Sequence, residues 1–470
     1  MDEGEEGAPL VLDNGGYRVR LGWGGAEAPV STIEPVVGYP FASGVTVGVR
    51  DKDRYVGDEA RSKRDYLALR FPIRNRSVEG WNWMEDLWRH LLPDMDPEEH
   101  PIMVADSWIA PDVARATTMA ILFENYSVLP PFAKPFAHPL PSVSQRTCRQ
   151  QVLAAVRAGR PTALVVDIGN DDTHIIPVVQ GEVHGNGAVQ LPGLGGANLT
   201  KYLATLLKKK APTTLDLDNH DSLAADIKHA LGYCSTNLEL DRRLAAMPQA
   251  SLPFYNSIRL NGTYLDLLPG ELLAAYQAPD GSIVEVGSER FECAEALFHP
   301  QPLCALDKYC SPKGIHYAVA DTINSLDSTG RDIQSELSRN ILLIGATARL
   351  SGLSTRLQQE VDKLITTAGL TVQVSVPPNP ELAPWIGGSK VSSAPGMIDH
   401  WVYKEDYDEC GADDEPHPTP RTPLTHSLTT THTTNHNCRP ATALGEAGDG
   451  CGMVRRCCFA FIGRADYFDV

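Results

Sequence analysis

The sequence lacks an apolar run long enough to cross a membrane. A spanning helix needs about 20 consecutive apolar residues, whereas the hydrophobic 42% of these 470 residues is spread over shorter segments. Four of the first seven residues are acidic, the opposite of the basic start of a secretory signal peptide. We therefore expect neither a membrane span nor a signal peptide.

Basic residues are also scarce relative to acidic ones. There are 41 Lys and Arg against 59 Asp and Glu, which gives a formal net charge of −18. A general nucleic-acid binder carries a basic face that neutralises phosphates, so we expect no direct contact with nucleic acid. This balance does not exclude a subunit of a chromatin complex, and solubility alone accounts for the excess of acid.

The ten cysteines lack the paired Cys-x-x-Cys spacing of a zinc site. Cys234, Cys293 and Cys304 stand inside patterned segments, which predicts buried thiols. Scattered free thiols are typical of a reduced, intracellular compartment.

The chain does contain one short motif twice. An apolar run ends in Asp13-Asn14-Gly15, and a second one ends in Asp167-Ile168-Gly169. Each copy predicts a strand, a tight acidic turn and a returning strand. Two such turns facing each other can clamp a phosphate chain with backbone N–H groups that glycine leaves uncovered. Their carboxylates can orient a hydrated divalent cation, although a single Asp-x-Gly turn is usually an ordinary hairpin.

Other segments predict the frame around these turns. Residues 81–92 have helical spacing, with Met84, Leu87, Trp88 and Leu91 on one face. Helices are also expected over 114–126, 149–156, 199–207, 223–231 and 353–364, and strands over 101–105, 281–286 and 341–344, whereas 264–271 looks irregular. Gly345 follows the 341–344 strand, and a strand-to-Gly-to-helix turn commonly receives a nucleotide.

Two stretches interrupt this pattern. Residues 130–141 are crowded with prolines and cannot form a regular element. Residues 413–450 are rich in Thr, His and Pro and nearly free of large apolar side chains, which predicts a disordered, solvated insert rather than a metal-binding tract. One hypothesis is that both inserts are intron sequence retained in the coding sequence.

Taken with their flanking segments, the three turns resemble those of actin and the actin-related proteins. The similar segments are 24–29, 55–64, 71–73, 98–101, 287–298, 314–316, 385–389 and 403–409. Similarity extends from about residue 8 to residue 410, and 452–459 resembles the C-terminus of actin.

The resemblance implies an α/β, actin-like ATPase fold with two α/β lobes around a nucleotide cleft. Lobe 1 is expected over 8–157, with a Pro-rich insert near 133–148, and lobe 2 over 158–381. Residues 382–410 and 451–459 are expected to return to lobe 1, around a low-complexity insert over 411–450.

The resemblance also implies a cofactor, ATP or ADP with Mg²⁺ or Ca²⁺. The residues predicted to bind it are Asp13, Gly15, Gly16, Tyr17, Arg20, Asp167, Gly169, Gly196, Lys228 and Gly345. Asp13 and Asp167 are expected to hold the metal through water. Gln150 falls where the family has a glutamine that orients the attacking water, and His174 matches the family histidine on the same water chain. Such a site suits phosphoryl transfer, which needs positioning and charge neutralisation more than a strong base.

Each assignment has a plainer alternative. The two aspartates can merely stabilise turns, His174 can be a core histidine, and the neighbouring Gln151 can shift the register of Gln150. Several positions also depart from the actin pattern. Gly16 and Ile168 stand where actin has serines, and Tyr17, Asp171 and Ala346 where it has glycines. Arg20 and Glu381 replace lysines, Asn170 and Asn198 replace aspartates, and His229 replaces a glutamate.

These departures weaken the expected nucleotide site. A hydrogen bond to a charged group is worth about 1.5–3 kcal/mol, so losing one serine lowers affinity roughly ten- to a hundredfold. Asp171 would also repel phosphates. We therefore expect an actin-related protein that is at most a weak actin-type ATPase.

Two functions follow from the resemblance. The first is an ATP- or ADP-binding cytoskeletal subunit, in a filament or an actin-related complex, in the cytoplasm. The alternative is a non-hydrolysing structural subunit of a nuclear chromatin-remodelling complex. Residues 38–48 resemble the filament-contact loop of actin, which favours the first. The expected partners are other actin-family subunits or actin-binding proteins. A sugar kinase is less consistent with the actin-specific segments.

Overall fold

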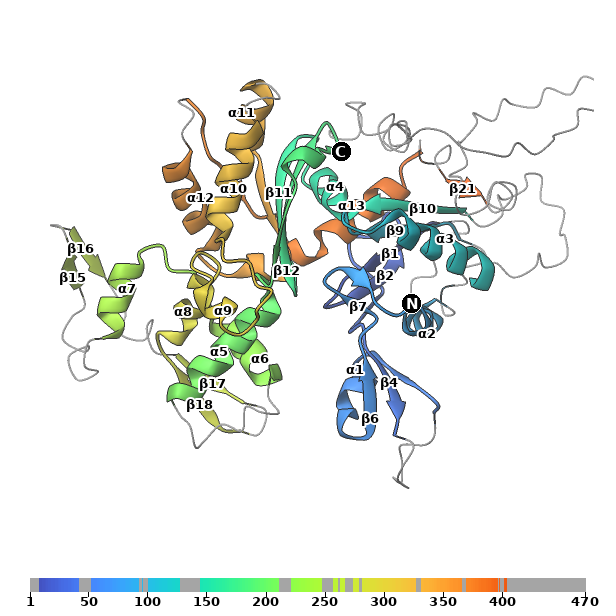
Figure 1. The fold of residues 1–470 in the computed structure, drawn as a ribbon, viewed down its shortest axis with the longest axis horizontal. Coiled ribbons are helices and arrows are strands. Elements are labelled where there is room, and N and C mark those ends of the chain that lie inside the picture. Colours follow the sequence, from blue (N-terminus) through green and yellow to red (C-terminus); the bar gives the residue numbers. More distant parts are fainter. Residues whose placement is uncertain are drawn as a thin grey trace, which may run out of the picture.

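The computed structural model describes residues 8–41, 52–92, 95, 100–126, 144–210, 221–246, 257–260, 263–266, 274–278, 281–326, 331–365, 369–395, 397 and 401–403. Figure 1 shows two α/β lobes beside each other, one carrying the first strands of the chain and the other its middle part. The prediction of an α/β fold with two lobes is confirmed.

The first lobe is built on a six-stranded sheet in the order β21-β10-β9-β1-β2-β3. Its strands are β1 (Leu10–Asn14), β2 (Val19–Trp23), β3 (Ser31–Ile33), β9 (Ile102–Asp106), β10 (Ser144–Arg149) and β21 (Val402–Tyr403). β10, β9 and β1 run parallel, and β2 and β3 continue the sheet antiparallel. β1 is central and begins with three fully buried apolar residues, because both of its faces are covered.

The principal helices of this lobe are α2 (Trp81–Leu91), α3 (Asp112–Tyr126), α4 (Gln150–Arg157) and α13 (Ala383–Ser392). α2 buries Met84, Leu87, Trp88 and Leu91, so the predicted apolar stripe is confirmed as core. α13 comes more than two hundred residues after α4 and packs directly on it (Figure 1). A Cβ at Gly387 would lie 1.9 Å from the Leu153 carbonyl oxygen, so this close helix contact requires glycine.

A small extension of the first lobe follows β3 in the chain. It contains β4 (Val37–Pro40), β5 (Tyr55–Val56) and β6 (Leu67–Arg70) in one sheet, with α1 (Gly57–Ser62) and the 3₁₀ helix η1 (Arg64–Tyr66). A short hairpin, β7 (Ile73–Arg74) and β8 (Ser77–Val78), follows. In Figure 1 this hairpin lies between the extension and the sheet of the first lobe.

The second lobe has a sheet in the order β13-β12-β11-β19-β20, with β14 paired to β12. Its strands are β11 (Ala163–Ile168), β12 (Asp172–Val179), β13 (Glu182–Val183), β14 (Val189–Pro192), β19 (Ile341–Ile344) and β20 (Val374–Ser375). Two small hairpins pair β15 (Ser257–Leu260) with β16 (Thr263–Asp266), and β17 (Ala274–Gln277) with β18 (Ile283–Val286).

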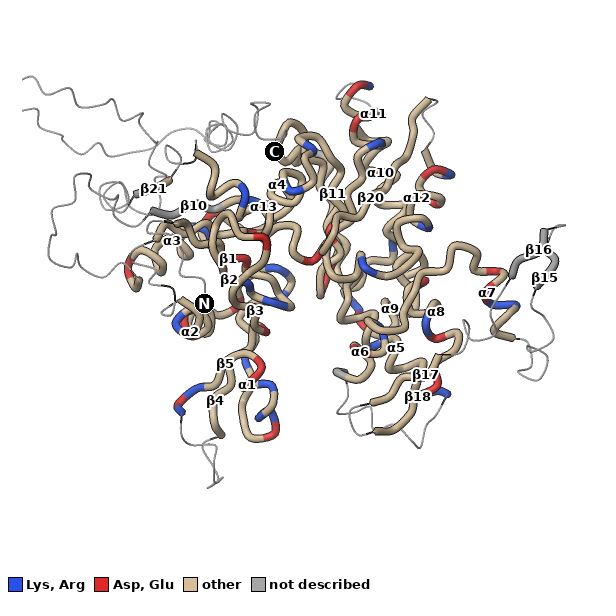
Figure 2. Tube along the Cα trace, turned by 180° about the vertical axis from the view of Figure 1, so that it is seen from behind, with Lys and Arg blue, Asp and Glu red and all other residues tan. Residues whose placement is uncertain are grey.

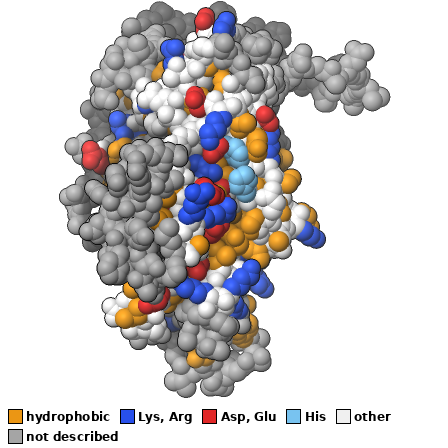
Figure 3. Space-filling model, turned by 90° about the vertical axis from the view of Figure 1, so that its left-hand side faces the viewer, with side chains coloured by type: hydrophobic (Ala, Val, Ile, Leu, Met, Phe, Trp, Pro, Cys, Tyr) orange, Lys and Arg blue, Asp and Glu red, His pale blue; other side chains and the backbone are white. Residues whose placement is uncertain are grey.

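The helices of the second lobe are α5 (Gly196–Lys210), α6 (Asp221–Leu231), α7 (Leu238–Ala245), α8 (Glu289–Glu295), α9 (Gln301–Cys304), α10 (Ile315–Ser325), α11 (Arg331–Arg339) and α12 (Leu353–Leu364). Short 3₁₀ helices are η3 (Gly185–Gly187), η7 (Ala346–Arg349) and η8 (Pro380–Leu382). Figure 3 shows the outer face of this lobe, where basic and acidic side chains lie together with histidines.

Each lobe has its own principal apolar core, and a smaller apolar cluster joins the lobes where α4 and α13 pack against β11, β12 and β19. The core of the second lobe joins β11 and β19 to α5, α8, α10 and α12, whereas the first lobe packs β1, β2 and β9 against α2 and α3. Cys234 and Cys293 are buried in the second core, as predicted, while Cys304 is only partly buried. Each core therefore supports one central strand that leads into an acidic turn.

Two details of the sequence interpretation were wrong. The Pro-rich insert was expected to include residues 144–148, but these form most of β10, which pairs with β9 in the middle of the lobe 1 sheet. The irregular stretch was expected to include residues 264–266, but these belong to β16. Both strands gain their regularity from pairing with a neighbour, which a single segment does not reveal. The predicted insert over 411–450, the return over 451–459, and most of the 38–48 loop lie outside the described residues.

Candidate functional site

The two predicted acidic turns form as hairpins. Asp13 pairs with Arg20 across β1 and β2, and Asp167 pairs with His174 across β11 and β12. Asp13 is 2% exposed and Asp167 is 5% exposed, because each ends a buried strand. The strand-turn-strand prediction is therefore confirmed for both copies.

The start of α4 joins the two turns. Gln150 donates its side-chain N–H to Asp13 Oδ1 at 2.8 Å, and the next residue, Gln151, donates to Asp167 Oδ2 at 3.0 Å. Consecutive side chains of one helix thus reach carboxylates of opposite lobes. The two aspartates are brought into one buried cluster, which is the arrangement expected from the sequence. The sequence pointed to Gln151 only as a residue that could take the place of Gln150, yet Gln151 contacts the second aspartate.

The first turn is completed from within its own lobe. Arg20 Nη1 lies 2.9 Å from Asp13 Oδ2, and its side chain is 11% exposed. Burial raises the pKa of Asp13, and the charge of Arg20 and the Gln150 hydrogen bond only partly oppose it. A Cβ at Gly15 would lie 2.5 Å from the Arg18 carbonyl oxygen, so only glycine fits the bend. Tyr17, predicted to contact nucleotide, is exposed.

The second turn is completed from the other lobe. Arg76, at the tip of the β7–β8 hairpin, donates to Asp167 Oδ2 at 2.5 Å and to Asp172 Oδ1 at 2.9 Å. Its Nη2 also lies 3.4 Å from the Asp167 carbonyl oxygen. A Cβ at Gly169 would come within 2.3 Å of Arg76 Nη2, so the glycine makes room for the guanidinium. Figure 2 shows acidic and basic residues close together where the lobes meet.

The charges in the second turn favour ionisation. Burial alone would raise the pKa of Asp167, but the charge and hydrogen bond of Arg76 outweigh it and leave the pKa lowered. Burial likewise opposes ionisation of Asp172, whose pKa falls because of His174 and Arg76. Burial alone would lower the pKa of Arg76, but the charges of Asp167 and Asp172 outweigh it and raise that pKa. The arginine and both aspartates are therefore charged at neutral pH.

The hairpin that carries Arg76 is strained. Asn75 has φ 47° and Arg76 has φ 58°, which is the left-handed region. This conformation costs a non-glycine residue roughly 1–2 kcal/mol, and it persists where surrounding contacts repay it. The Asn75 backbone N–H also donates to Asp171 Oδ2 at 2.9 Å. Both residues of the turn thus contact the second lobe.

The predicted catalytic pair is engaged by protein partners. His174 is fully buried, and its Nε2 lies 3.0 Å from Asp172 Oδ2, which also accepts from Gln190 at 2.7 Å. The side-chain amide of Gln150 donates to Asp13. His174 therefore belongs to the network around Arg76 rather than projecting freely into the cleft.

A carboxylate lies between the two turns. A Cβ at Gly16 would lie 3.7 Å from Asp171 Oδ2, so the acidic side chain of the second turn reaches the glycine of the first. The sequence predicts that Asp171 repels phosphates in the space between the two turns. The Asp171 carboxylate lies in that space, where backbone N–H groups of both turns were expected to face a phosphate chain.

The polar groups predicted to lie near the nucleoside are also hydrogen-bonded to other groups of the protein. Lys228 Nζ donates to the Gly196 carbonyl oxygen and to Thr200 Oγ1, both at 2.7 Å, and burial lowers its pKa to about 8. Gly196 N donates to the Gly169 carbonyl oxygen at 2.9 Å. Gly345 has φ 91°, and a Cβ there would lie 2.2 Å from the Ile168 carbonyl oxygen. Gly196 and Gly345, both predicted to bind the cofactor, thus lie beside the second turn.

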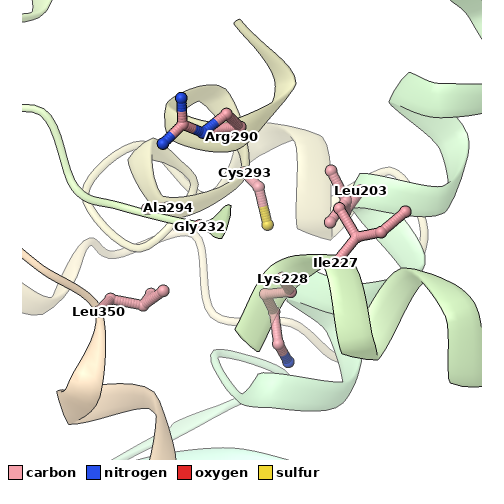
Figure 4. A pocket seen from close by; sticks show the side chains of 8 residues that line it. All are labelled: Leu203, Ile227, Lys228, Gly232, Arg290, Cys293, Ala294 and Leu350. Carbon is pink, nitrogen blue, oxygen red and sulfur yellow. The ribbon is translucent and has the colours of Figure 1, made fainter. Parts of the chain in front are cut away.

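A small cavity adjoins Lys228. Its interior leaves essentially no room for a water molecule, so it is far from the roughly 300–1,000 Å³ of ordinary ligand pockets. The lining residues are Leu203, Ile227, Lys228, Gly232, Arg290, Cys293, Ala294 and Leu350. Figure 4 shows that the Lys228 ammonium points away from Arg290 and Cys293. Across the nucleoside side, Glu381 is paired with Arg349 at 2.8 Å.

The donor set does not fit a divalent cation held by both aspartates. In Asp13, Oδ1 accepts from Gln150 and Oδ2 from Arg20; in Asp167, Oδ2 accepts from Arg76 and Gln151. A guanidinium already supplies positive charge beside Asp167. Among the described residues, no group of three or more His, Cys, Asp and Glu is arranged to hold a metal ion.

Sequence reasoning missed Arg76 and Asp172. The available signal was a two-residue turn, Asn75-Arg76, between short strands, where Asn-Gly is the favoured sequence. An arginine in such a turn indicates a side chain that is needed there. Its partners are more than ninety residues away, so the sequence could not identify them.

The comparison with known families agrees with this architecture. The family model described as Actin matches residues 4–414, and the chain belongs to the actin family. The fold is therefore the actin-like one, as the resemblance implied. Proteins of this fold generally bind a nucleotide with a divalent cation. No helix in the described part of the chain is both long and apolar enough to span a membrane.

Proposed function

We propose that this chain is an actin-related protein that serves as a non-hydrolysing structural subunit of an actin-family assembly. ATP or ADP binds weakly in the cleft between the two acidic turns. The family match supports an actin or actin-related protein, and the specific role rests on the geometry of the cleft.

The observation that carries this proposal is the engagement of the predicted catalytic pair. Gln150 donates to Asp13, and His174 is fully buried against Asp172. A group that orients an attacking water must be within hydrogen-bond reach of it. The Gln150 amide nitrogen and His174 Nε2 are bonded to protein carboxylates, and His174 Nδ1 is buried. This arrangement supports a site that does not turn over ATP.

Weak binding follows from what remains of the clamp. The glycines of both turns are retained, but Gly15 N–H donates to the Asp13 carbonyl oxygen at 3.2 Å and Gly169 N–H to that of Asp172 at 2.9 Å. Only the remaining N–H groups of the turns are left for a polyphosphate. Asp171 adds a negative charge beside Gly16. Lys228 is bonded to Gly196 and Thr200, and the neighbouring cavity is small. A nucleotide therefore gains phosphate contacts but meets repulsion and a tight nucleoside side.

The assembly that the subunit joins has two candidates. The first is a cytoskeletal one in the cytoplasm, with other actin-family subunits or actin-binding proteins as partners. The second is a nuclear chromatin-remodelling complex, which is favoured by the same lack of a catalytic arrangement, because a structural subunit needs no turnover. Direct binding of nucleic acid is not part of either proposal.

The test of the enzymatic part combines two measurements on natively purified protein. Chromatography after denaturation identifies any retained nucleotide, and a phosphate-release assay follows added ATP. We expect little retained nucleotide and no release above background. Sustained release that is lost in Gln150→Ala would overturn the non-hydrolysing role.

The binding part is tested by titrating a fluorescent ATP analogue. Asp13→Ala is expected to abolish binding, since it removes the carboxylate that holds Arg20 and Gln150 at the first turn. Asp58→Ala is the matched control, because the Asp58 side chain is 71% exposed and pairs only with Arg18 among the ion pairs of the described residues. Unchanged binding in Asp13→Ala would refute the assignment of the first turn.

Sedimentation separates the two assemblies. Pelleting of purified protein in the presence of Mg-ATP, alone or with actin, supports the cytoskeletal candidate. Co-purification of a soluble monomer with chromatin-remodelling subunits supports the nuclear one.

A further inference from the structure

The contact between the lobes at the second turn consists of one arginine and two aspartates. One side is Arg76 on the β7–β8 hairpin of the first lobe, and the other is the pair Asp167 and Asp172 on the second. The Arg76 side chain is 13% exposed, and the aspartate side chains are 7% and 1% exposed. This is a buried ionic contact between two lobes that also share an apolar cluster, where α4 and α13 pack against β11, β12 and β19.

The contact is built into the surrounding residues rather than being incidental. The hairpin keeps Arg76 at φ 58°, and Gly169 leaves the space that the guanidinium fills. Gln151 donates to Asp167, while His174 and Gln190 bond Asp172. Each carboxylate is therefore held in position by a further side chain of a different element.

The Arg76 guanidinium lies where a divalent cation was expected. Asp167 is the carboxylate expected to face a hydrated divalent ion, and its Oδ2 is bonded to a guanidinium instead. An ion held between Asp13 and Asp167 would stand close to Arg76, and like charges at short range repel strongly in a buried site. Arg76 supplies positive charge to the same acidic cluster without dehydrating a metal.

We propose that the guanidinium of Arg76 replaces the divalent cation of this cleft, so that the two lobes close on each other without a metal ion. The inference concerns closure alone and does not depend on whether nucleotide binds or is hydrolysed. Closure follows because Arg76 belongs to the first lobe and both of its carboxylate partners belong to the second. Separating the lobes would leave two buried carboxylates without their cation.

The experiment compares full-length protein in EDTA and in Mg²⁺ alone, without nucleotide. Thermal unfolding and small-angle scattering are measured for the wild type, Arg76→Gly and Arg74→Gly. Arg74 is the matched control because it lies on the same hairpin and its side chain is 55% exposed, approaching Glu79 at 3.9 Å and lying over the Phe71 ring at 4.9 Å. Glycine at position 76 also relieves the backbone strain, which favours folding of the variant.

The wild type and Arg74→Gly are expected to melt at the same temperature in EDTA and Mg²⁺, within about 1 °C, and to keep the same radius of gyration. Arg76→Gly is expected to expand in EDTA, and to contract and gain several degrees of melting temperature in Mg²⁺, because its freed carboxylates can then take the ion. A wild type that expands or loses stability in EDTA would overturn the proposal.

A second result would also overturn it. If Arg76→Gly is destabilised equally in EDTA and Mg²⁺, Arg76 is an ordinary structural ion pair and not a replacement for the metal. Should Arg76→Gly not fold, Arg76→Gln takes its place, since it keeps a polar side chain without the charge. Phosphate release measured on the same preparations tests the non-hydrolysing role separately, so failure of one conclusion is distinguishable from failure of the other.

Discussion

The two acidic turns have the same backbone plan but different counter-charges. Asp13 pairs with Arg20 of the adjacent strand, seven residues later in the same hairpin, and its pKa is raised by burial. Asp167 pairs with Arg76 from the other lobe, and its pKa is lowered despite equal burial. Two similar sequence motifs thus carry carboxyl groups with opposite tendencies to hold a proton.

The difference shows that a counter-charge can be local or can join two bodies. The first turn is complete within the hairpin that contains it, so opening the cleft leaves Asp13 and Arg20 together. The second turn is complete only when Arg76 of the first lobe reaches it. Interactions at the second turn therefore contribute to how the lobes sit, and those at the first mainly to local order.

The largest expected effect comes from removing the two arginines in turn. Arg76→Ala should lower the free energy of unfolding by about 3–5 kcal/mol, as breaking a buried pair leaves uncompensated charge. Arg20→Ala should cost about 1.5–3 kcal/mol, since Asp13 keeps its Gln150 bond and loses one charged hydrogen bond. Urea unfolding measures both, and equal losses would contradict the proposed asymmetry.

The pH dependence should separate the turns next. The folded pKa values of Asp167 and Asp172 are lowered, so the stability they supply is complete above about pH 4 and is lost as the pH falls through their folded values. The folded pKa of Asp13 is raised, so the opposite holds: stability increases as the pH falls through that value. The two turns therefore respond to acid with opposite signs.

Two variants test these opposite signs by melting temperature across the acid range. Asp13→Asn should remove the gain on mild acidification, and Asp167→Asn should reduce the loss at stronger acid while lowering stability at neutral pH. Asp58→Asn, on an exposed carboxylate, serves as the control. Parallel pH profiles for Asp13→Asn and Asp167→Asn would be inconsistent with one raised and one lowered pKa.

A smaller contrast is expected between the turn glycines. Gly169→Ala places a Cβ 2.3 Å from Arg76 Nη2, so the guanidinium must move away from Asp167, at a cost of about 1–3 kcal/mol. Gly16→Ala meets its nearest atom at 3.7 Å, which is ordinary contact, and should change stability by less than about 0.5 kcal/mol. Denaturant midpoints decide the matter, and a neutral Gly169→Ala would indicate that Arg76 is loosely held.

The smallest effect concerns the carboxylate between the turns. Asp171→Asn removes a charge beside Gly16 and should tighten binding of a fluorescent ATP analogue roughly fivefold, the equivalent of about 1 kcal/mol for one screened charge pair. Asp171→Glu keeps the charge and is expected to bind like the wild type. If both variants bind alike, repulsion by Asp171 does not limit affinity.

Much of the frame could be predicted from local pattern. The apolar runs before Asp13 and Asp167 form β1 and β11, and the helical stripe at Met84, Leu87 and Trp88 forms a buried face, because periodicity reflects burial directly. β10 was missed because a polar strand following prolines carries no such pattern, and its pairing with β9 decides its structure.

The sequence by itself determined two acidic hairpins on buried strands, their glycines and the family to which the chain belongs, since these depend on residues adjacent along the chain. Only the tertiary structure decided which cation each carboxylate faces. Arg76 and Asp167 are ninety-one residues apart and meet because the packing of the two lobes brings a strained hairpin against a glycine turn. Coulomb interactions depend on distance in space, and no local pattern encodes that distance.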